Sequence, residues 1–358
     1  MRIKKALFLG TLCTAVSGMS LFAQAGVSYA KSAEKTTEAA SSEEAESEEE
    51  TSEEVTYPIT IEHAFGETVI ESKPERIATI GWENQDTPLA LGVAPVGVSA
   101  ANYGMVTDNN LHPWTDEAFA DLGVEKPVVF DDVDGLDFEQ ISDCNPDVIL
   151  AAYSGMTQED YDTLSQIAPV IPYKEKAWQT SWREQTIENA EGMGMKPEGE
   201  KKVKEVEDLI AEKLDEYPQL EGIPTAFCWI SADDFSTFYV YLPTDPRAAY
   251  LLDLGFTLPE SVQKLAGETD DFNITVSREN ADQLDDIQLM VVYGDEDLLK
   301  SLQEDKLMSQ IPAIKNGAVA LVDSTSALAG ACTPSILSIP YEIDEYLQLL
   351  SDAAENIK

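Results

Sequence analysis

Residues 199–217 read GEKKVKEVEDLIAEKLDEY, and this stretch decides how the rest of the chain is arranged. Its apolar residues recur at spacings of three and four, which predicts one amphipathic α-helix. Those residues are Val203, Val206, Leu209, Ile210, Leu214 and Tyr217. At 1.5 Å per residue the helix extends about 28 Å, and Pro218 ends it. The preceding residues also read as helical, so we expect a long helical stretch over 180–217.

Before this helix, short apolar strands alternate with helical segments. The alternation predicts a parallel sheet with helices on both faces. The predicted strands are Arg76–Ile80, Ala94–Val98, Val148–Ala152 and Pro169–Ile171, and a β-hairpin over Ile59–Ile70 precedes them. The predicted helices between them are Thr87–Gly92, Asp137–Cys144 and Tyr161–Ile167.

After Pro218 the alternating pattern starts again. The predicted strands are Ala226–Ile230, Phe238–Leu242, Leu289–Tyr293 and Ala318–Val322, and an amphipathic helix over Tyr341–Ala354 closes the chain. The sequence therefore predicts an α/β fold of two Rossmann-like lobes joined by a single long α-helix. We expect the first lobe over 56–180, the connecting helical region over 181–218 and the second lobe over 219–358.

The first 55 residues have the composition of an export signal and a spacer. Residues 1–30 combine a basic start, an apolar stretch and Ser28-Tyr29-Ala30, which predicts a signal peptide and an exported protein. A lipid anchor on Cys13 stays open as an alternative, so we expect the protein either in a periplasm or on the outer face of the membrane. Residues 31–55 are acidic and without apolar periodicity, which predicts a disordered linker.

The charge of the chain excludes several classes of partner. The sequence has 67 acidic and 23 basic residues, a formal net charge of −44. Phosphate binding needs a basic face, so we expect no nucleic-acid partner. The same charge repels anionic ligands at long range, and any bound anion must be held by a few focused Arg or Lys side chains.

Motifs for catalysis or for a resident metal are not found in the sequence. With only two histidines in 358 residues, a three-histidine metal site is excluded. GxSxG, HExxH, P-loop and GxGxxG patterns are all missing, so we expect no enzyme activity and no cofactor. A secreted α/β hydrolase is the alternative from another class, and it lacks a nucleophile motif. Besides Cys13, the cysteines are Cys144, Cys228 and Cys332, which we expect to be buried free thiols.

Aromatic residues follow or end several of the predicted strands. Ligands of parallel α/β sheets bind beyond the carboxyl ends of the strands, so these rings predict an aromatic-lined cleft between the lobes. Arg247 opens a helix and could offer its planar guanidinium to a ligand oxygen. The alternatives are rings buried in separate cores and a surface ion pair for the arginine. The candidate ligand-binding residues are Trp82, Tyr103, Tyr153, Trp178, Trp229, Tyr239 and Arg247.

An ordered set of short segments resembles one known family over about residues 57–358. The chain is similar to the helical-backbone substrate-binding proteins of ABC importers for siderophores, haem and cobalamin, with the iron–siderophore branch closest. The segments that carry the resemblance are Lys73–Ile77, Leu91–Val98, Asp137–Ile141, Asn145–Leu150, Ile167–Val170, Trp178–Trp182, Leu254–Phe256, Ser277–Asn280 and Pro334–Tyr341.

The resemblance implies a function and two docking residues. It implies capture of a ferric siderophore, with iron bound only through the chelator, and delivery by a monomer to an ABC permease and its ATPase. Few basic residues fall near the proposed cleft, which favours a hydroxamate-type ligand over a trianionic catecholate; cobalamin or haem stays open as an alternative. Glu139 and Glu279 match the positions at which family members dock on the permease, one carboxylate on each lobe.

Overall fold

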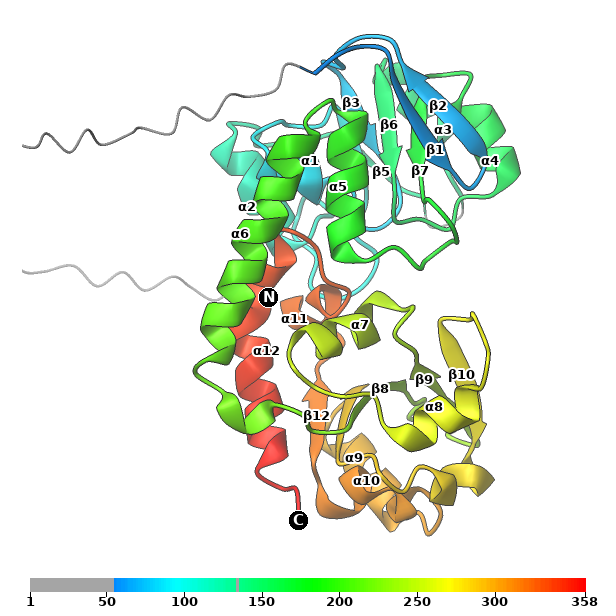
Figure 1. The fold of residues 1–358 in the computed structure, drawn as a ribbon, viewed down its shortest axis with the longest axis vertical. Coiled ribbons are helices and arrows are strands. Elements are labelled where there is room, and N and C mark those ends of the chain that lie inside the picture. Colours follow the sequence, from blue (N-terminus) through cyan, green and yellow to red (C-terminus); the bar gives the residue numbers. More distant parts are fainter. Residues whose placement is uncertain (1–54, 133–134) are drawn as a thin grey trace, which may run out of the picture. The chain divides into compact units, whose positions relative to one another are not determined.

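The computed structural model describes residues 55–132 and 135–358, which Figure 1 shows as two lobes, one above the other. The predicted signal peptide, and the predicted linker up to residue 54, lie outside the described residues. These described residues all belong to one compact unit. No helix in this part of the chain has the length and apolar character needed to cross a membrane.

The first lobe is built on a five-stranded parallel sheet with the order β5-β4-β3-β6-β7. These strands are β3 (Ile77–Thr79), β4 (Gly97–Ser99), β5 (Val129–Phe130), β6 (Val148–Ala151) and β7 (Val170–Pro172). The helices are α1 (Asp86–Ala90), α2 (Pro113–Asp121), α3 (Phe138–Asp143), α4 (Gln158–Leu164) and α5 (Trp182–Gly192). The predicted hairpin forms as β1 (Ile59–His63) paired with β2 (Gly66–Ile70).

The second lobe is built on another five-stranded sheet, with the order β10-β9-β8-β11-β12. The strands are β8 (Thr225–Trp229), β9 (Thr237–Tyr241), β10 (Asn273–Ser277), β11 (Leu289–Tyr293) and β12 (Val319–Val322). The helices are α7 (Pro246–Asp253), α8 (Glu260–Ala266), α9 (Glu296–Glu304), α10 (Pro312–Asn316), α11 (Ala327–Ala331) and α12 (Ser338–Ala354), with short 3₁₀ turns η1 (Pro218–Leu220), η2 (Arg278–Gln283) and η3 (Met308–Gln310).

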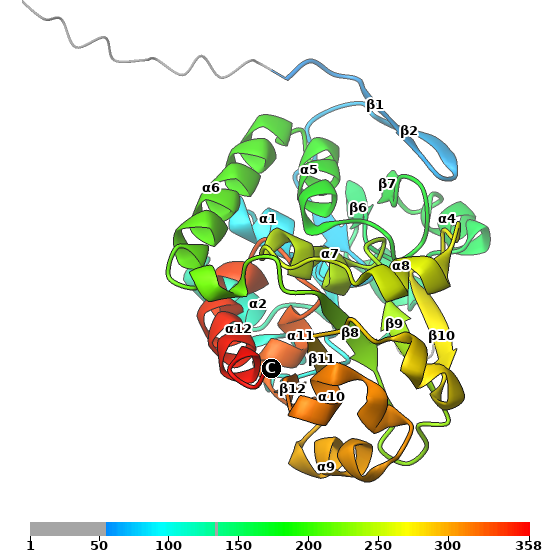
Figure 2. The same ribbon diagram turned by 60° about the horizontal axis from the view of Figure 1, so that its bottom comes forward.

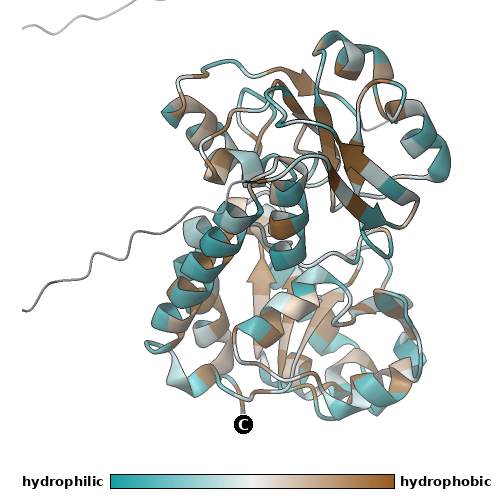
Figure 3. Cartoon of the chain, turned by 45° about the horizontal axis from the view of Figure 1, so that its top comes forward, coloured by the Kyte–Doolittle hydropathy of each residue, from teal (hydrophilic) through white to brown (hydrophobic). Residues whose placement is uncertain are grey.

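This second sheet is mixed and not purely parallel. Strand β9 pairs antiparallel with both β8 and β10, whereas β8, β11 and β12 are parallel. The reason is the short loop between β8 and β9, since a parallel pair needs a long crossover connection. The sequence analysis did not predict β10. Figure 2 shows the sheet of this lobe from below, and Figure 3 shows the strands as hydrophobic segments among more hydrophilic helices. The α/β class with two sheets is confirmed.

The helical stretch over 180–217 is two helices, not one. Helix α5 ends at Gly192, and α6 (Lys196–Leu214) begins after Gly194, whose φ of 66° belongs to the left-handed region that favours glycine. Helix α5 packs on α6 and belongs to the first lobe, so of these two helices only α6 connects the lobes (Figure 1). Its 19 residues extend about 28 Å, and Val203, Val206 and Ile210 form the buried face predicted from their spacing.

A second connection runs beside α6. Helix α12 packs along α6, and both share one apolar cluster with the second sheet. The segment before α12 returns to the first lobe, where the Ser335 hydroxyl donates a hydrogen bond of 2.5 Å to the carboxylate of Asp86. Trp114 Nε1 and the Thr115 hydroxyl donate to the same carboxylate, at 2.9 and 2.8 Å. Asp86 therefore joins α1, α2 and the segment before α12 in one buried network.

Burial governs the titration of this network. It raises the pKa of Asp86 from 3.8 to about 6, although the three hydrogen bonds work in the opposite direction. The folded protein therefore holds a proton on Asp86 at pH values where the unfolded chain has released it. Stability from this group is present below the ordinary pKa of the carboxyl and is lost as the pH rises through about 6.

Asp86→Asn keeps the shape of the side chain and removes its titration. Between about pH 7 and about pH 3.5, the wild type should gain about 3 kcal/mol of unfolding free energy relative to D86N. Urea unfolding of both proteins at several pH values in this range measures the gain. A difference between the two proteins that does not change with pH would contradict the raised pKa.

Candidate functional site

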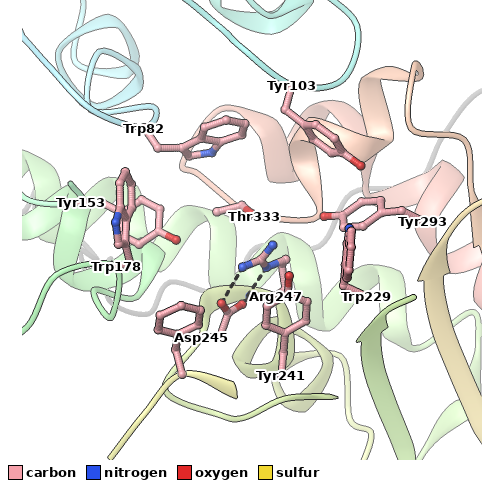
Figure 4. Close-up of a pocket in the computed structure, with 11 residues that line it drawn as sticks. Trp82, Tyr103, Tyr153, Trp178, Trp229, Tyr241, Asp245, Arg247, Tyr293 and Thr333 are labelled. Atoms are coloured by element: carbon pink, nitrogen blue, oxygen red, sulfur yellow. Dashed lines mark hydrogen bonds and ion pairs between the residues drawn. The ribbon is translucent and has the colours of Figure 1, made fainter. Parts of the chain in front are cut away.

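A pocket of about 350 Å³ lies between the two lobes, and eight of its eleven lining residues are aromatic. Figure 4 shows the rings around a central arginine and aspartate. The first lobe supplies four residues and the second lobe supplies seven. They are Trp82, Tyr103, Tyr153 and Trp178, and then Trp229, Tyr241, Asp245, Arg247, Phe272, Tyr293 and Thr333.

The first-lobe rings reach the pocket from the loops that follow the parallel strands. Trp82 follows β3, Tyr103 follows β4, Tyr153 follows β6 and Trp178 follows β7. Parallel strands carry their carboxyl ends to one edge of a sheet, so four loops far apart in sequence converge there. In the second lobe, Trp229 and Tyr293 end the parallel strands β8 and β11 and come to the pocket for the same reason.

Ring contacts organise the walls of the pocket. Tyr153 and Trp178 meet edge to face, with centroids 5.3 Å apart. Tyr103 of the first lobe and Tyr293 of the second meet in the same way at 5.2 Å, so this pair closes one side of the pocket across the lobes. Trp178 and Trp229 are 38% and 40% exposed, so their rings offer apolar surface to a ligand.

Arg247 and Asp245 form the only charged pair among the lining residues. The Asp245 carboxylate accepts hydrogen bonds from Nε and Nη2 of Arg247, at 2.8 and 2.7 Å. It also accepts the backbone N–H of Arg247 at 2.9 Å and so caps helix α7. The guanidinium lies 3.8 Å from the ring centroid of Tyr241, in a cation–π contact. Burial disfavours the charged arginine, yet the bonds and charge of Asp245 hold its pKa above the usual value.

The pocket tyrosines are neutral phenols. Burial raises the pKa of Tyr103 to about 12, and it also raises the pKa of Tyr153 and of Tyr293. These hydroxyl groups can therefore donate hydrogen bonds to ligand oxygens at neutral pH. With the arginine paired to the aspartate, the formal charges of the lining residues sum to zero.

The structure brings six of the seven predicted site residues into this one pocket. Tyr239 is the exception, because it stacks on Trp229 at 5.4 Å and does not line the pocket. Their role in binding a ligand stays a prediction. The sequence analysis missed Tyr241, Asp245, Phe272, Tyr293 and Thr333. Tyr293 and Tyr241 end strands, as the chosen rings do, and Asp245 directly precedes the Pro246-Arg247 helix start; Phe272 and Thr333 have no such local signal.

Other predicted residues lie away from the pocket. Glu139 is exposed in the first turn of α3, and Glu279 is exposed in η2 of the second lobe, so each lobe has one of them. Their docking role stays a prediction. Cys144, Cys228 and Cys332 are buried and unpaired, as expected. Among residues 55–132 and 135–358, no three His, Cys, Asp or Glu side chains are grouped to hold a metal ion.

Two α/β lobes, one connecting helix and an aromatic pocket between the lobes define a two-lobed solute-binding protein. Residues 77–325 match the model of the periplasmic binding protein family, and the chain belongs to that family.

Relatives of the chain include proteins that bind siderophores. The crystal structure of Streptococcus pneumoniae TIGR4 PiaA in complex with ferrichrome is 48% identical, with a TM-score of 0.81, and the match covers 84% of this chain and 100% of that one. The petrobactin-binding protein YclQ of Bacillus subtilis (strain 168) is 24% identical over 81% of this chain and 88% of its own length. Staphylococcus aureus SirA complexed with staphyloferrin B, at 23% identity and a TM-score of 0.63, shares the fold over 84% of this chain and 99% of that one.

The backbone of Gly155 supports the indole of Trp178. A Cβ atom at Gly155 would lie 2.5 Å from Trp178 Nε1, which is too close for the ring to stay in place. Gly155→Ala should displace the ring, shift the tryptophan emission of the ligand-free protein and cost about 1–3 kcal/mol of stability. The matched measurement is the same substitution in a Trp178→Phe background, where the emission shift should vanish. An equal shift in both backgrounds would contradict the packing described here.

Proposed function

We propose that this chain is the extracytoplasmic substrate-binding protein of an ABC importer. In this proposal it captures a ferric siderophore of the hydroxamate type in the interlobe pocket and delivers it to a permease and its ATPase. The observation that carries the proposal is an aromatic pocket without net charge, placed between two lobes of a chain that is 48% identical to PiaA, whose structure contains ferrichrome.

The chemistry of ferric hydroxamates fits this pocket. Three hydroxamate anions neutralise one ferric ion, so the complex has an apolar rim, several polar oxygens and no net charge. The rings supply a wall for the rim, while Arg247 and the neutral phenols supply donors for the oxygens. The acidic chain repels anions at long range and leaves a neutral complex unaffected.

In this proposal the protein performs no reaction, and it holds no metal of its own. Iron enters and leaves inside its chelator, so protein side chains contact the chelate and not the ion. The binding protein acts outside the membrane as a monomer, after export directed by residues 1–30. Glu139 and Glu279 orient it on the permease, because two charges on separate lobes fix the direction of approach.

Binding should be visible as a shift in melting temperature. A ligand that binds only the folded state at a hundredfold excess over its Kd adds about 2.7 kcal/mol of stability. Ferrichrome should raise the melting temperature, and it should do so more than cobalamin or haem does. Trp178→Ala should weaken ferrichrome binding about tenfold or more, whereas Leu252→Ala, an exposed side chain outside the pocket, should leave it unchanged. No shift with ferric hydroxamates, catecholates or carboxylates would refute the siderophore proposal.

Docking can be separated from ligand binding by charge reversal. The double variant Glu139→Lys, Glu279→Lys should abolish uptake of radioactive iron from ferrichrome in cells that depend on this protein, and its Kd should stay within about twofold of the wild type. The control is Glu159→Lys, Glu296→Lys, which reverses two exposed charges in the first turns of α4 and α9, one on each lobe. Normal uptake by the first variant, or equal loss in both, would refute the docking role.

A further inference from the structure

Asp245 is a buried carboxylate in the wall of an otherwise aromatic pocket. Its side chain is 1% exposed, and that of Arg247 is 20% exposed. Three N–H groups of Arg247, one from the backbone and two from the guanidinium, donate to its two oxygens. Figure 4 shows the Arg247 guanidinium bonded to the Asp245 carboxylate, with aromatic residues on several sides of the pair.

The pairing has an electrostatic consequence for the ligand. A guanidinium in a partly buried wall, if unpaired, attracts anions strongly because the local dielectric constant is low. Asp245 lies at hydrogen-bond distance and cancels that charge. Since these are the only two charged residues in the lining, the pocket offers no net attraction to an anion.

The pairing also has a geometric consequence. Asp245 occupies Nε and Nη2, while Tyr241 covers one face of the guanidinium, so the arginine is held from two sides. The N–H groups of Nη1 take no part in the two guanidinium bonds to Asp245. An arginine held in this way presents hydrogen-bond donors in a fixed direction without presenting an unbalanced charge.

We infer that Asp245 is a specificity-determining residue, which makes the pocket select ferric complexes without net charge over anionic ones. It does so by cancelling the charge of Arg247 while keeping its donors in place. This inference rests on the proposed function, because it concerns the choice among ferric siderophores in that same pocket.

The test is Asp245→Asn, which removes the charge and keeps the size of the side chain. Asparagine is also an effective N-cap residue, so helix α7 keeps its cap. Dissociation constants for ferrichrome, which is neutral, and for a trianionic ferric tris-catecholate are measured by quenching of tryptophan fluorescence. The ratio of the catecholate Kd to the ferrichrome Kd should fall at least tenfold in the variant.

The matched control is Asp253→Asn on the same helix. Asp253 accepts from Arg183 and Trp182 outside the pocket, and its substitution changes the net charge of the protein by the same amount. Its Kd ratio should equal that of the wild type. A second variant, Asp245→Asn combined with Arg247→Gln, returns the lining to zero net charge and should restore the preference for the neutral complex, with weaker binding.

The outcomes separate the inference from the proposed function. If wild type binds ferrichrome but D245N keeps the wild-type ratio, or loses both ligands equally, the inference is wrong and the proposed function stands. If wild type binds none of the ferric complexes, the proposed function fails and this inference fails with it. A ratio that falls equally in D245N and D253N would assign the effect to the charge of the whole protein and would also overturn the inference.

Discussion

Two helices hold the lobes at a fixed spacing, and the pocket depends on that constraint. Helix α6 connects the lobes, and α12 packs along it within one shared apolar cluster. The start of α12 is tied back to the first lobe by the bond from Ser335 to Asp86. Because α6 and α12 are packed along each other, bending one lobe toward the other would have to distort that packing, so we expect little motion between open and closed forms. The carboxyl edges of the two sheets thus face each other before any ligand arrives.

The charge of the molecule and the charge of its pocket differ sharply. The chain has a net charge of −44, yet the pocket lining sums to zero through a single buried ion pair. The acidic surface keeps anions away at long range, while the local pair removes the short-range attraction that a lone arginine would exert. The two effects act in the same direction, since each disfavours an anionic ligand.

Two titratable side chains, Glu83 and His112, are buried next to Trp82. Glu83 is buried beside Asp86, its φ is 53°, and its carboxylate lies 3.6 Å from Nε2 of His112. Burial raises the pKa of Glu83 and lowers that of His112 to about 4, so the imidazole is uncharged at neutral pH and this contact is not an ion pair. The left-handed backbone of Glu83 comes directly after Trp82, one of the rings that line the pocket.

Local patterns in the sequence determined the two α/β lobes, the helix between them and most of the rings that meet in the pocket. Strand–helix alternation, the apolar stripe of α6 and the rule that parallel strands end at one edge act within short segments, so they can be read without coordinates. The break at Gly194 and the antiparallel β9 depend on how segments pack, and they were missed. Only the tertiary structure decided that Tyr241 and not Tyr239 lines the pocket. Arg247, at the start of α7, contacts the ring of Tyr241, whereas Trp229 stacks on the ring of Tyr239. The tertiary structure also brought Thr333 and Phe272 to the site. Contacts between residues far apart in the chain leave no periodic pattern in the local sequence, so these two residues could not be predicted from it.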